Sequence, residues 1–167
     1  MGRLFSNLFH GNIIQGMYLC TMKVEDEIKQ QQFESPQHRA GMNIIFTANW
    51  LLNQYSTVLK PIDLSLQQLN VLTILKGQPD MTATVNLIRE RMIDRMPNVS
   101  RLLNKLMEKK LIEKDRNLSD QRVVYIKLTD KGEKVAKMGR GLFQKVTYGV
   151  TKSQAEMLND LLEHLRK

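Results

Sequence analysis

The chain has 167 residues, of which 42% are hydrophobic, and this is enough for one buried core and a single globular domain. Its 25 Lys and Arg outnumber 17 Asp and Glu, and the net charge of +8 favours a polyanionic partner such as nucleic acid or an anionic membrane surface. The single cysteine excludes an intramolecular disulfide framework, and no apolar run is long enough to span a membrane, so we expect a cytoplasmic protein.

The N-terminal part of the chain differs in composition from the rest. Residues 1–21 contain no acidic side chain and hold the only cysteine, Cys20. We interpret them as an upstream extension from a misassigned start codon or as a mobile arm, and an extra helix at a dimer interface is the alternative. Residues 25–37 are polar, and Ser35 and Pro36 near the end of this segment disfavour a helix that continues through them. Residues 1–37 are therefore predicted to be an N-terminal extension.

Three helices are predicted next. The first is long, runs from about residue 39 to 60, and has an apolar face broader than one contact within the chain needs. A capping box over residues 65–68 opens the second helix, which ends at Gly77. Residues 84–92 form the third, the first helix of a helix-turn-helix.

The most strongly amphipathic stretch follows, as a helix with Asp94 as its N-cap and Pro97 in its first turn. Its apolar residues share one face at helical spacing: Val99, Leu102, Leu103, Leu106 and Met107. Its other face carries Asn98, Arg101, Asn104, Lys105, Glu108 and Lys109. Arginine can pair with guanine and asparagine with adenine through two hydrogen bonds each, so this face can read base edges. Such residues also cover ordinary solvent-facing helices.

A β-hairpin with a charged loop is predicted after this helix. Residues 111–116 and 123–128 have the composition of strands, and a polar turn ending in Arg122 joins them. Thr129 can then cap another helix. This order is typical of a winged helix-turn-helix, a mainly α fold with a small β-hairpin wing. Residues 84–127 carry 11 Lys and Arg against 6 Asp and Glu, so most of the excess positive charge lies here.

The chain resembles the MarR family of bacterial transcription regulators in three segments that follow one another in the family's order, residues 99–103, 120–122 and 128–132. The resemblance covers the chain from about residue 39 to the C-terminus. Its specific part is the Asp-x-Arg of the wing followed by Leu-Thr-x-Lys-Gly. Lys110 departs from the pattern, because many relatives carry a helix-ending glycine there.

The resemblance implies a winged-helix domain over residues 38–167. Its DNA-binding lobe would span about 65–129, and its N- and C-terminal dimerisation helices about 39–60 and 130–166. Residues 130–147 read as a basic helix in which Gly139 and Gly141 mark a bend or a close helix–helix contact. A second capping box over residues 151–154 opens the last helix. The apolar faces of the terminal helices favour the intertwined dimer that the resemblance implies.

The predicted function is that of a sequence-specific DNA-binding transcription regulator, a ligand-responsive repressor acting as a homodimer on an inverted-repeat operator. The recognition helix would enter the major groove, and Arg122, oriented by Asp120, would enter the minor groove. The predicted DNA-binding residues are Asn98, Ser100, Arg101, Asn104, Lys105, Lys109, Asp120 and Arg122. The alternative function is a nucleoid or scaffold protein that binds DNA without sequence preference.

Small-molecule sites are less clearly indicated. Members of the family often bind small aromatic compounds between the dimer arms and the DNA-binding lobe, which suggests Trp50 and Tyr55 as effector contacts. The favoured interpretation of both residues is nevertheless as core or dimer-interface aromatics. Some relatives sense peroxide through a cysteine near the first dimerisation helix, but Cys20 lies well before that helix. The histidines lack the spacing of metal ligands, and no catalytic motif occurs, so neither a metal, a cofactor nor an enzyme is predicted.

Overall fold

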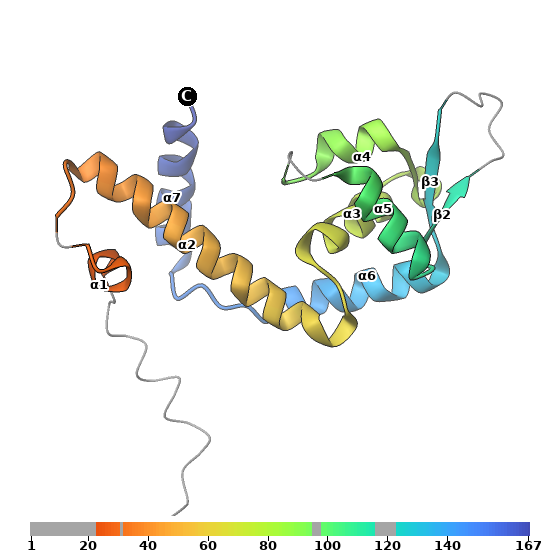
Figure 1. The fold of residues 1–167 in the computed structure, drawn as a ribbon, viewed down its shortest axis with the longest axis horizontal. Helices are drawn as coiled ribbons and strands as arrows, with labels where there is room; N and C mark the ends of the chain where they lie inside the picture. The colour runs from red at the N-terminus through yellow and green to blue at the C-terminus, as the bar shows by residue number, and fades with distance from the viewer. Residues whose placement is uncertain (1–22, 31, 95–97, 116–122) are drawn as a thin grey trace, which may run out of the picture. The chain divides into compact units, whose positions relative to one another are not determined.

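The computed structural model describes residues 23–30, 32–94, 98–115 and 123–167 (Figure 1). The chain divides into two compact units, Met1–Trp50 and Leu51–Lys167. The described residues form helices and one three-stranded antiparallel sheet, which confirms the predicted mainly α fold with a small β element. None of the helices in these ranges is both long and apolar enough to cross a membrane.

The first unit contains α1 (Val24–Ile28) and the first part of α2 (Pro36–Leu59). Helix α2 begins with Pro36 at its first position, where the missing N–H costs nothing, so it starts earlier than the predicted residue 39. The Arg39 side chain donates two hydrogen bonds to the Glu25 carboxylate, one of them 3.1 Å long between Nη2 and Oε2. These bonds lower the pKa of Glu25 from 4.5 to about 2.

Protonation of Glu25 is expected to release α1 from α2. Because the pKa of Glu25 is depressed in the folded state, its ion pair with Arg39 contributes stability above pH 4.5 that is lost as the pH falls towards 2. Amide hydrogen-exchange protection of α1 should fall over this interval, and Glu25→Gln should lack the protection already at neutral pH. Equal protection in the variant and the natural protein at pH 7 would contradict this expectation.

The second unit holds the remaining elements, and Figure 1 labels its helices α3 to α7 and its strands β2 and β3. In chain order they are η1 (Lys60–Ile62), α3 (Leu66–Lys76), η2 (Pro79–Met81), β1 (Thr82–Thr84), α4 (Val85–Arg91), α5 (Val99–Glu108), β2 (Ile112–Asp115), β3 (Tyr125–Leu128), α6 (Asp130–Phe143) and α7 (Lys152–Leu165). Both predicted capping boxes are present, Ser65 with Gln68 on α3 and Thr151 with Gln154 on α7.

The sheet has the strand order β1–β3–β2, with Ile126 of β3 paired to Ala83 on one side and Lys114 on the other. Strand β1 was not expected from the sequence, because three residues are too few to show alternation. The core of the second unit lies among α3, α4, α5, α6 and the sheet. Its largest fully buried side chains are Leu59, Val71, Leu72, Leu75, Ile88, Leu106 and Ile126.

Two details of the helices differ from the prediction. The N-cap of α5 is Asn98, not Asp94, because the Asn98 side chain accepts a 3.1 Å hydrogen bond from the backbone N–H of Arg101. Helix α6 ends at Phe143 rather than residue 147. Gly139 marks a close contact with α3, since a Cβ there would lie 2.5 Å from the Leu69 side chain.

Lys110 ends the recognition helix with φ +58°, the left-handed conformation that glycine adopts without cost. Lys110→Gly is therefore expected to raise the free energy of unfolding by about 1 kcal/mol in urea titration. Lys110→Ala removes the same charge but keeps the Cβ, so it should give no such gain. Equal stabilisation by both substitutions would contradict backbone strain as the cause.

Candidate DNA-binding surface

Helix α5 gathers four of the predicted DNA-binding residues on its solvent-exposed side: Ser100, Arg101, Asn104 and Lys105 are all exposed. The opposite side of the helix is held in the core by Val99, Leu103 and Leu106, which are buried as the sequence pattern predicts. The buried side fixes the rotation of the helix about its axis. A rigid scaffold therefore presents the polar side chains together.

Asn98 and Lys109 lie at the two ends of α5 and already have partners within the chain. The Asn98 Oδ1 atom accepts the capping bond, which competes with the two-bond pairing of asparagine to adenine. The Lys109 Nζ atom lies 2.9 Å from a carboxylate oxygen of Asp63 and also bonds the Asp63 carbonyl. A phosphate contact from Lys109 would have to compete with this ion pair.

The motif Leu-Thr-x-Lys-Gly anchors the end of the recognition helix. The Lys131 side chain donates a 2.9 Å hydrogen bond to the carbonyl of Lys109, one of the unpaired carbonyls at the end of α5. The Thr129 hydroxyl accepts from the Gly132 N–H at 3.0 Å and lies 2.9 Å from the Lys110 carbonyl, to which it can donate. The motif is visible in the sequence, but the anchoring role of Lys131 is visible only in the folded chain, because Lys131 and Lys109 are 22 residues apart.

The helix before α5 is also fixed at both ends. The Thr84 side chain caps α4 by accepting from the Leu87 N–H at 3.1 Å. After α4, Asn70 Oδ1 accepts a 3.0 Å hydrogen bond from the Ile93 N–H, which ties the turn of the helix-turn-helix to α3. No pattern in the sequence indicated Asn70, because the bond joins residues 23 positions apart.

Strands β2 and β3 pair as the stem of the predicted wing, and Ile112 faces Leu128 in the register. Asp120 and Arg122, the two predicted DNA-binding residues of the wing, lie outside the described residues. Their contacts with DNA remain predictions.

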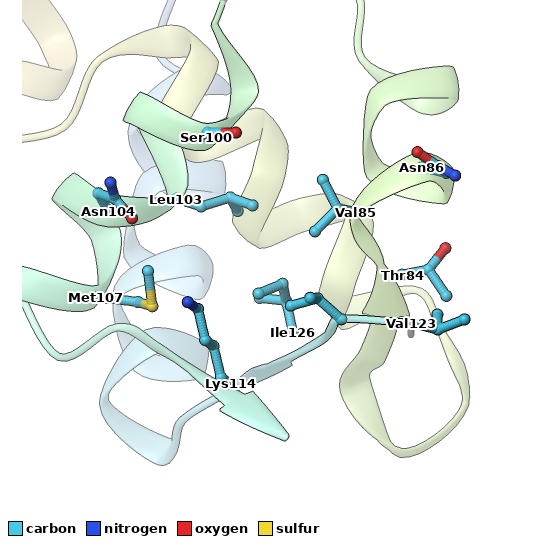
Figure 2. A pocket seen from close by; sticks show the side chains of 11 residues that line it. Thr84, Val85, Asn86, Ser100, Leu103, Asn104, Met107, Lys114, Val123 and Ile126 are labelled. Carbon is cyan, nitrogen blue, oxygen red and sulfur yellow. The ribbon is translucent and has the colours of Figure 1, made fainter. Parts of the chain in front are cut away.

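A cavity of about 410 Å³ lies between α5, the start of α4 and the sheet (Figure 2). Its lining residues are Thr84, Val85, Asn86, Ser100, Leu103, Asn104, Met107, Lys114, Val123, Val124 and Ile126. Two predicted DNA-binding residues, Ser100 and Asn104, thus form part of its wall. In Figure 2 the Lys114 side chain extends from β2 towards Met107.

A smaller cavity of about 250 Å³ lies between α3 and α6 and is lined by Leu66, Leu69, Asn70, Thr73, Ile93, Arg140, Phe143 and Gln144. The Tyr55 ring stacks on Phe143 with a centroid distance of 4.0 Å. The Tyr55 hydroxyl lies 2.6 Å from that of Tyr148, and burial together with this hydrogen bond raises the pKa of Tyr55 to about 12. Trp50, the other predicted effector contact, is 44% exposed and lies on a different side of α2, about 140° away by helical geometry.

Comparison with known proteins identifies a family of regulators. Residues 53–138 match the family model of the transcriptional regulator SarA/Rot. The HTH-type transcriptional regulator TcaR of Staphylococcus aureus is 35% identical over 91 residues, which cover 53% of this chain and 58% of TcaR. The HTH-type transcriptional repressor IacR of Pseudomonas putida is 27% identical over 110 residues, which cover 64% of this chain and 65% of IacR. The matched regions span less than two thirds of the length of either relative.

Among solved structures, a mutant MarR of E. coli in complex with operator DNA superposes with a TM-score of 0.65. It is 22% identical, and the match covers 75% of this chain and 91% of that one, so the shared feature is the winged-helix fold. The family-model match includes α3, α4, α5, all three strands and most of α6. The chain therefore belongs to the SarA/Rot family of DNA-binding transcriptional regulators, which has the MarR-type winged-helix fold and is not a family of enzymes.

Proposed function

We propose that this regulator is a homodimeric repressor that reads an inverted-repeat operator through α5. The observation that carries the proposal is the exposed row of Ser100, Arg101, Asn104 and Lys105 on a helix fixed at both ends. Arg101 and Asn104 have the side chains that pair with guanine and adenine, whereas Lys105 can hold a phosphate. As a regulator of transcription, the protein would act in the cytoplasm.

The dimer is proposed from the unpartnered apolar surface of the last helix. Four large apolar side chains of α7 are exposed over about half of their surface or more: Met157 64%, Leu158 49%, Leu161 63% and Leu165 64%. They recur at helical spacing on one side of α7, where each would be costly to leave in water. We propose that a second copy of the chain covers this apolar surface. An inverted-repeat operator requires such a dimer, because the two-fold axis of the dimer then matches that of the DNA.

A ligand response is proposed at the cavity between α3 and α6. A molecule there would touch Asn70 and Ile93, which together hold the turn between α4 and α5. Phe143 offers an aromatic wall, backed by Tyr55, and Arg140 offers a cation. A bound effector could therefore shift the position of α5 by favouring one arrangement of this turn. Trp50 as an effector contact stays a prediction from the sequence.

The experiment that tests DNA reading is fluorescence-anisotropy titration of the full chain. One duplex carries the DNA upstream of its own coding region and the other carries a scrambled version. Arg101→Ala is expected to weaken binding to the upstream duplex by about 1–3 kcal/mol and to leave binding to the scrambled one nearly unchanged. Lys105→Ala should weaken both alike, since phosphates carry no sequence.

Lys152→Ala on α7 is the control for lost charge, because Lys152 is outside α5 and is 92% exposed. It should leave both affinities within a factor of about two. Equal binding of the natural protein to both duplexes would instead favour the alternative function, DNA coating without sequence preference.

A further inference from the structure

Helix α6 carries a face of lysines that the proposed reading of DNA by α5 does not use. The face consists of three exposed side chains, Lys134, Lys137 and Lys145. Lys134 and Lys137 are about one turn apart on α6, and Lys145 follows in a turn closed by a 3.0 Å bond from its N–H to the Leu142 carbonyl. Within the described part of the chain, none of the three amines forms an ion pair or a hydrogen bond. All three charges are therefore available to a partner.

The surroundings of this lysine face are poor in acids. Residues 134–155 contain five Lys and Arg and no Asp or Glu. Helix α2, whose Tyr55 stacks on Phe143 of α6, has no acidic residue either. Of the two acids at the start of α6, Glu133 is paired with Lys76 at 3.0 Å, which leaves Asp130 at the edge of the face. The chain's own carboxylates thus do little to neutralise these lysines.

The lysine face is turned away from the core of the second unit. The opposite side of α6 is buried, since Ala136 is fully covered and a Cβ at Gly139 would meet Leu69 of α3. Helix α3 in turn contacts α4 and α5. In Figure 1, α6 and α4 lie on opposite sides of this unit. A duplex that is seated on α5 therefore does not cover the lysine face.

The chemistry of the face favours phosphates over a protein surface. Protein interfaces are depleted in lysine at their centre and are anchored by large aromatic or arginine side chains. Between these lysines the one large apolar side chain of α6 that is exposed is Met138, at 56%. A lysine ammonium on its flexible stem binds a phosphate as a point charge and reads no base. The face therefore fits the backbone of duplex DNA, whose charges repeat along the helix.

We propose that the lysine face of α6 binds the phosphates of a second DNA duplex, so that the protein bridges two segments of DNA. This binding is independent of sequence, because phosphates carry no base information. The phosphate binding depends on α6 alone, whereas a bridge that starts from the operator rests on the proposed function of α5. The competing occupant is the α7 helix of a second copy, which carries Glu156, Asp160 and Glu163 on one side.

The bridge is tested with beads that carry the DNA upstream of the protein's own coding region. The whole chain is bound to these beads, and a labelled duplex of scrambled sequence is then added. The natural protein should retain the labelled duplex. The triple variant Lys134→Gln, Lys137→Gln and Lys145→Gln should retain about tenfold less, because three phosphate contacts are lost. Its affinity for the upstream duplex in fluorescence anisotropy should match that of the control variant.

The control variant combines Lys23→Gln, Lys152→Gln and Lys167→Gln, which removes the same charge from exposed positions outside α5 and α6. It should retain the labelled duplex as the natural protein does. A salt series adds a second readout, since each phosphate contact contributes about 0.9 to the slope of log affinity against log salt concentration. Binding of the second duplex should therefore lose about 2–3 from this slope in the triple variant and nothing in the control.

Three results would overturn the proposal. The first is that the natural protein retains no labelled duplex. The second is that the triple variant retains as much as the control, because the two α5 helices of a dimer would then hold the two duplexes. The third is that the triple variant has a smaller mass in sedimentation velocity, because the lysine face would then bind a second copy. If the natural protein binds upstream and scrambled DNA alike while the triple variant loses the second duplex, only the proposed sequence reading fails.

Discussion

Gly132→Ala is expected to lower the free energy of unfolding by about 3 kcal/mol, the largest stability effect that we predict for one added methyl group. A Cβ at this position would lie 2.0 Å from the carbonyl oxygen of Leu111 and 2.8 Å from Cδ1 of Leu128. The carbonyl cannot move away freely, because it accepts a 3.1 Å hydrogen bond from the Thr129 N–H. The start of α6 would therefore separate from the turn that ends α5.

The matched control is Gly141→Ala in the same helix, where the added Cβ would have no described atom within 4 Å apart from its chain neighbours and the adjoining helix backbone. It should raise the free energy of unfolding by about 1 kcal/mol through helix propensity alone. Both variants can be compared by urea denaturation monitored by circular dichroism. Similar stabilities of the two variants would contradict the close approach of α6 to Leu111.

Leu161→Glu is expected to convert the proposed dimer to a monomer and to weaken operator binding roughly hundredfold, because the two half-sites are then bound independently. Leu161 is 63% exposed in the single chain and lies in the middle of the apolar side of α7. A buried, unpaired carboxylate at a subunit interface costs several kcal/mol. Sedimentation velocity measures the mass of the protein in solution, and fluorescence anisotropy measures its affinity for the operator.

Asn159→Glu adds the same charge on the polar side of α7 and should leave the protein dimeric. If Leu161→Glu remains a dimer at micromolar concentration, the apolar side of α7 is not the dimer interface. If the natural protein is itself monomeric, the inverted-repeat operator must be abandoned as well.

The elements with strong local patterns could be predicted from the sequence. The apolar spacing of α5 places Val99, Leu103 and Leu106 in the core, as observed, and both capping boxes form where the Ser or Thr and Gln spacing indicates. The family resemblance marks Lys110, because many relatives carry glycine there, and the positive φ of Lys110 explains that glycine. The apolar spacing and the capping boxes depend only on residues within one or two turns of each other.

Features that depend on the tertiary structure could not be predicted. Strand β1 exists because β3 offers it a partner, and the bond from Ile93 to Asn70 joins distant segments. The competing partners of Asn98 and Lys109 are likewise seen only in the folded chain, since Asp63 is 46 residues from Lys109. Both cavities are lined by segments that are far apart in the sequence, so no single stretch of sequence contains their pattern.

Sequence reading by α5 can be tested by selecting DNA from a pool of random duplexes with the purified protein and sequencing the DNA that is bound. We predict enrichment of an inverted repeat whose half-site centres lie about one helical turn apart, one for each α5 of the dimer. Arg101→Ala should lose the preference at one symmetric pair of positions while retaining the spacing. Recovery of DNA without any common sequence, at an affinity set only by salt concentration, would contradict sequence reading by α5.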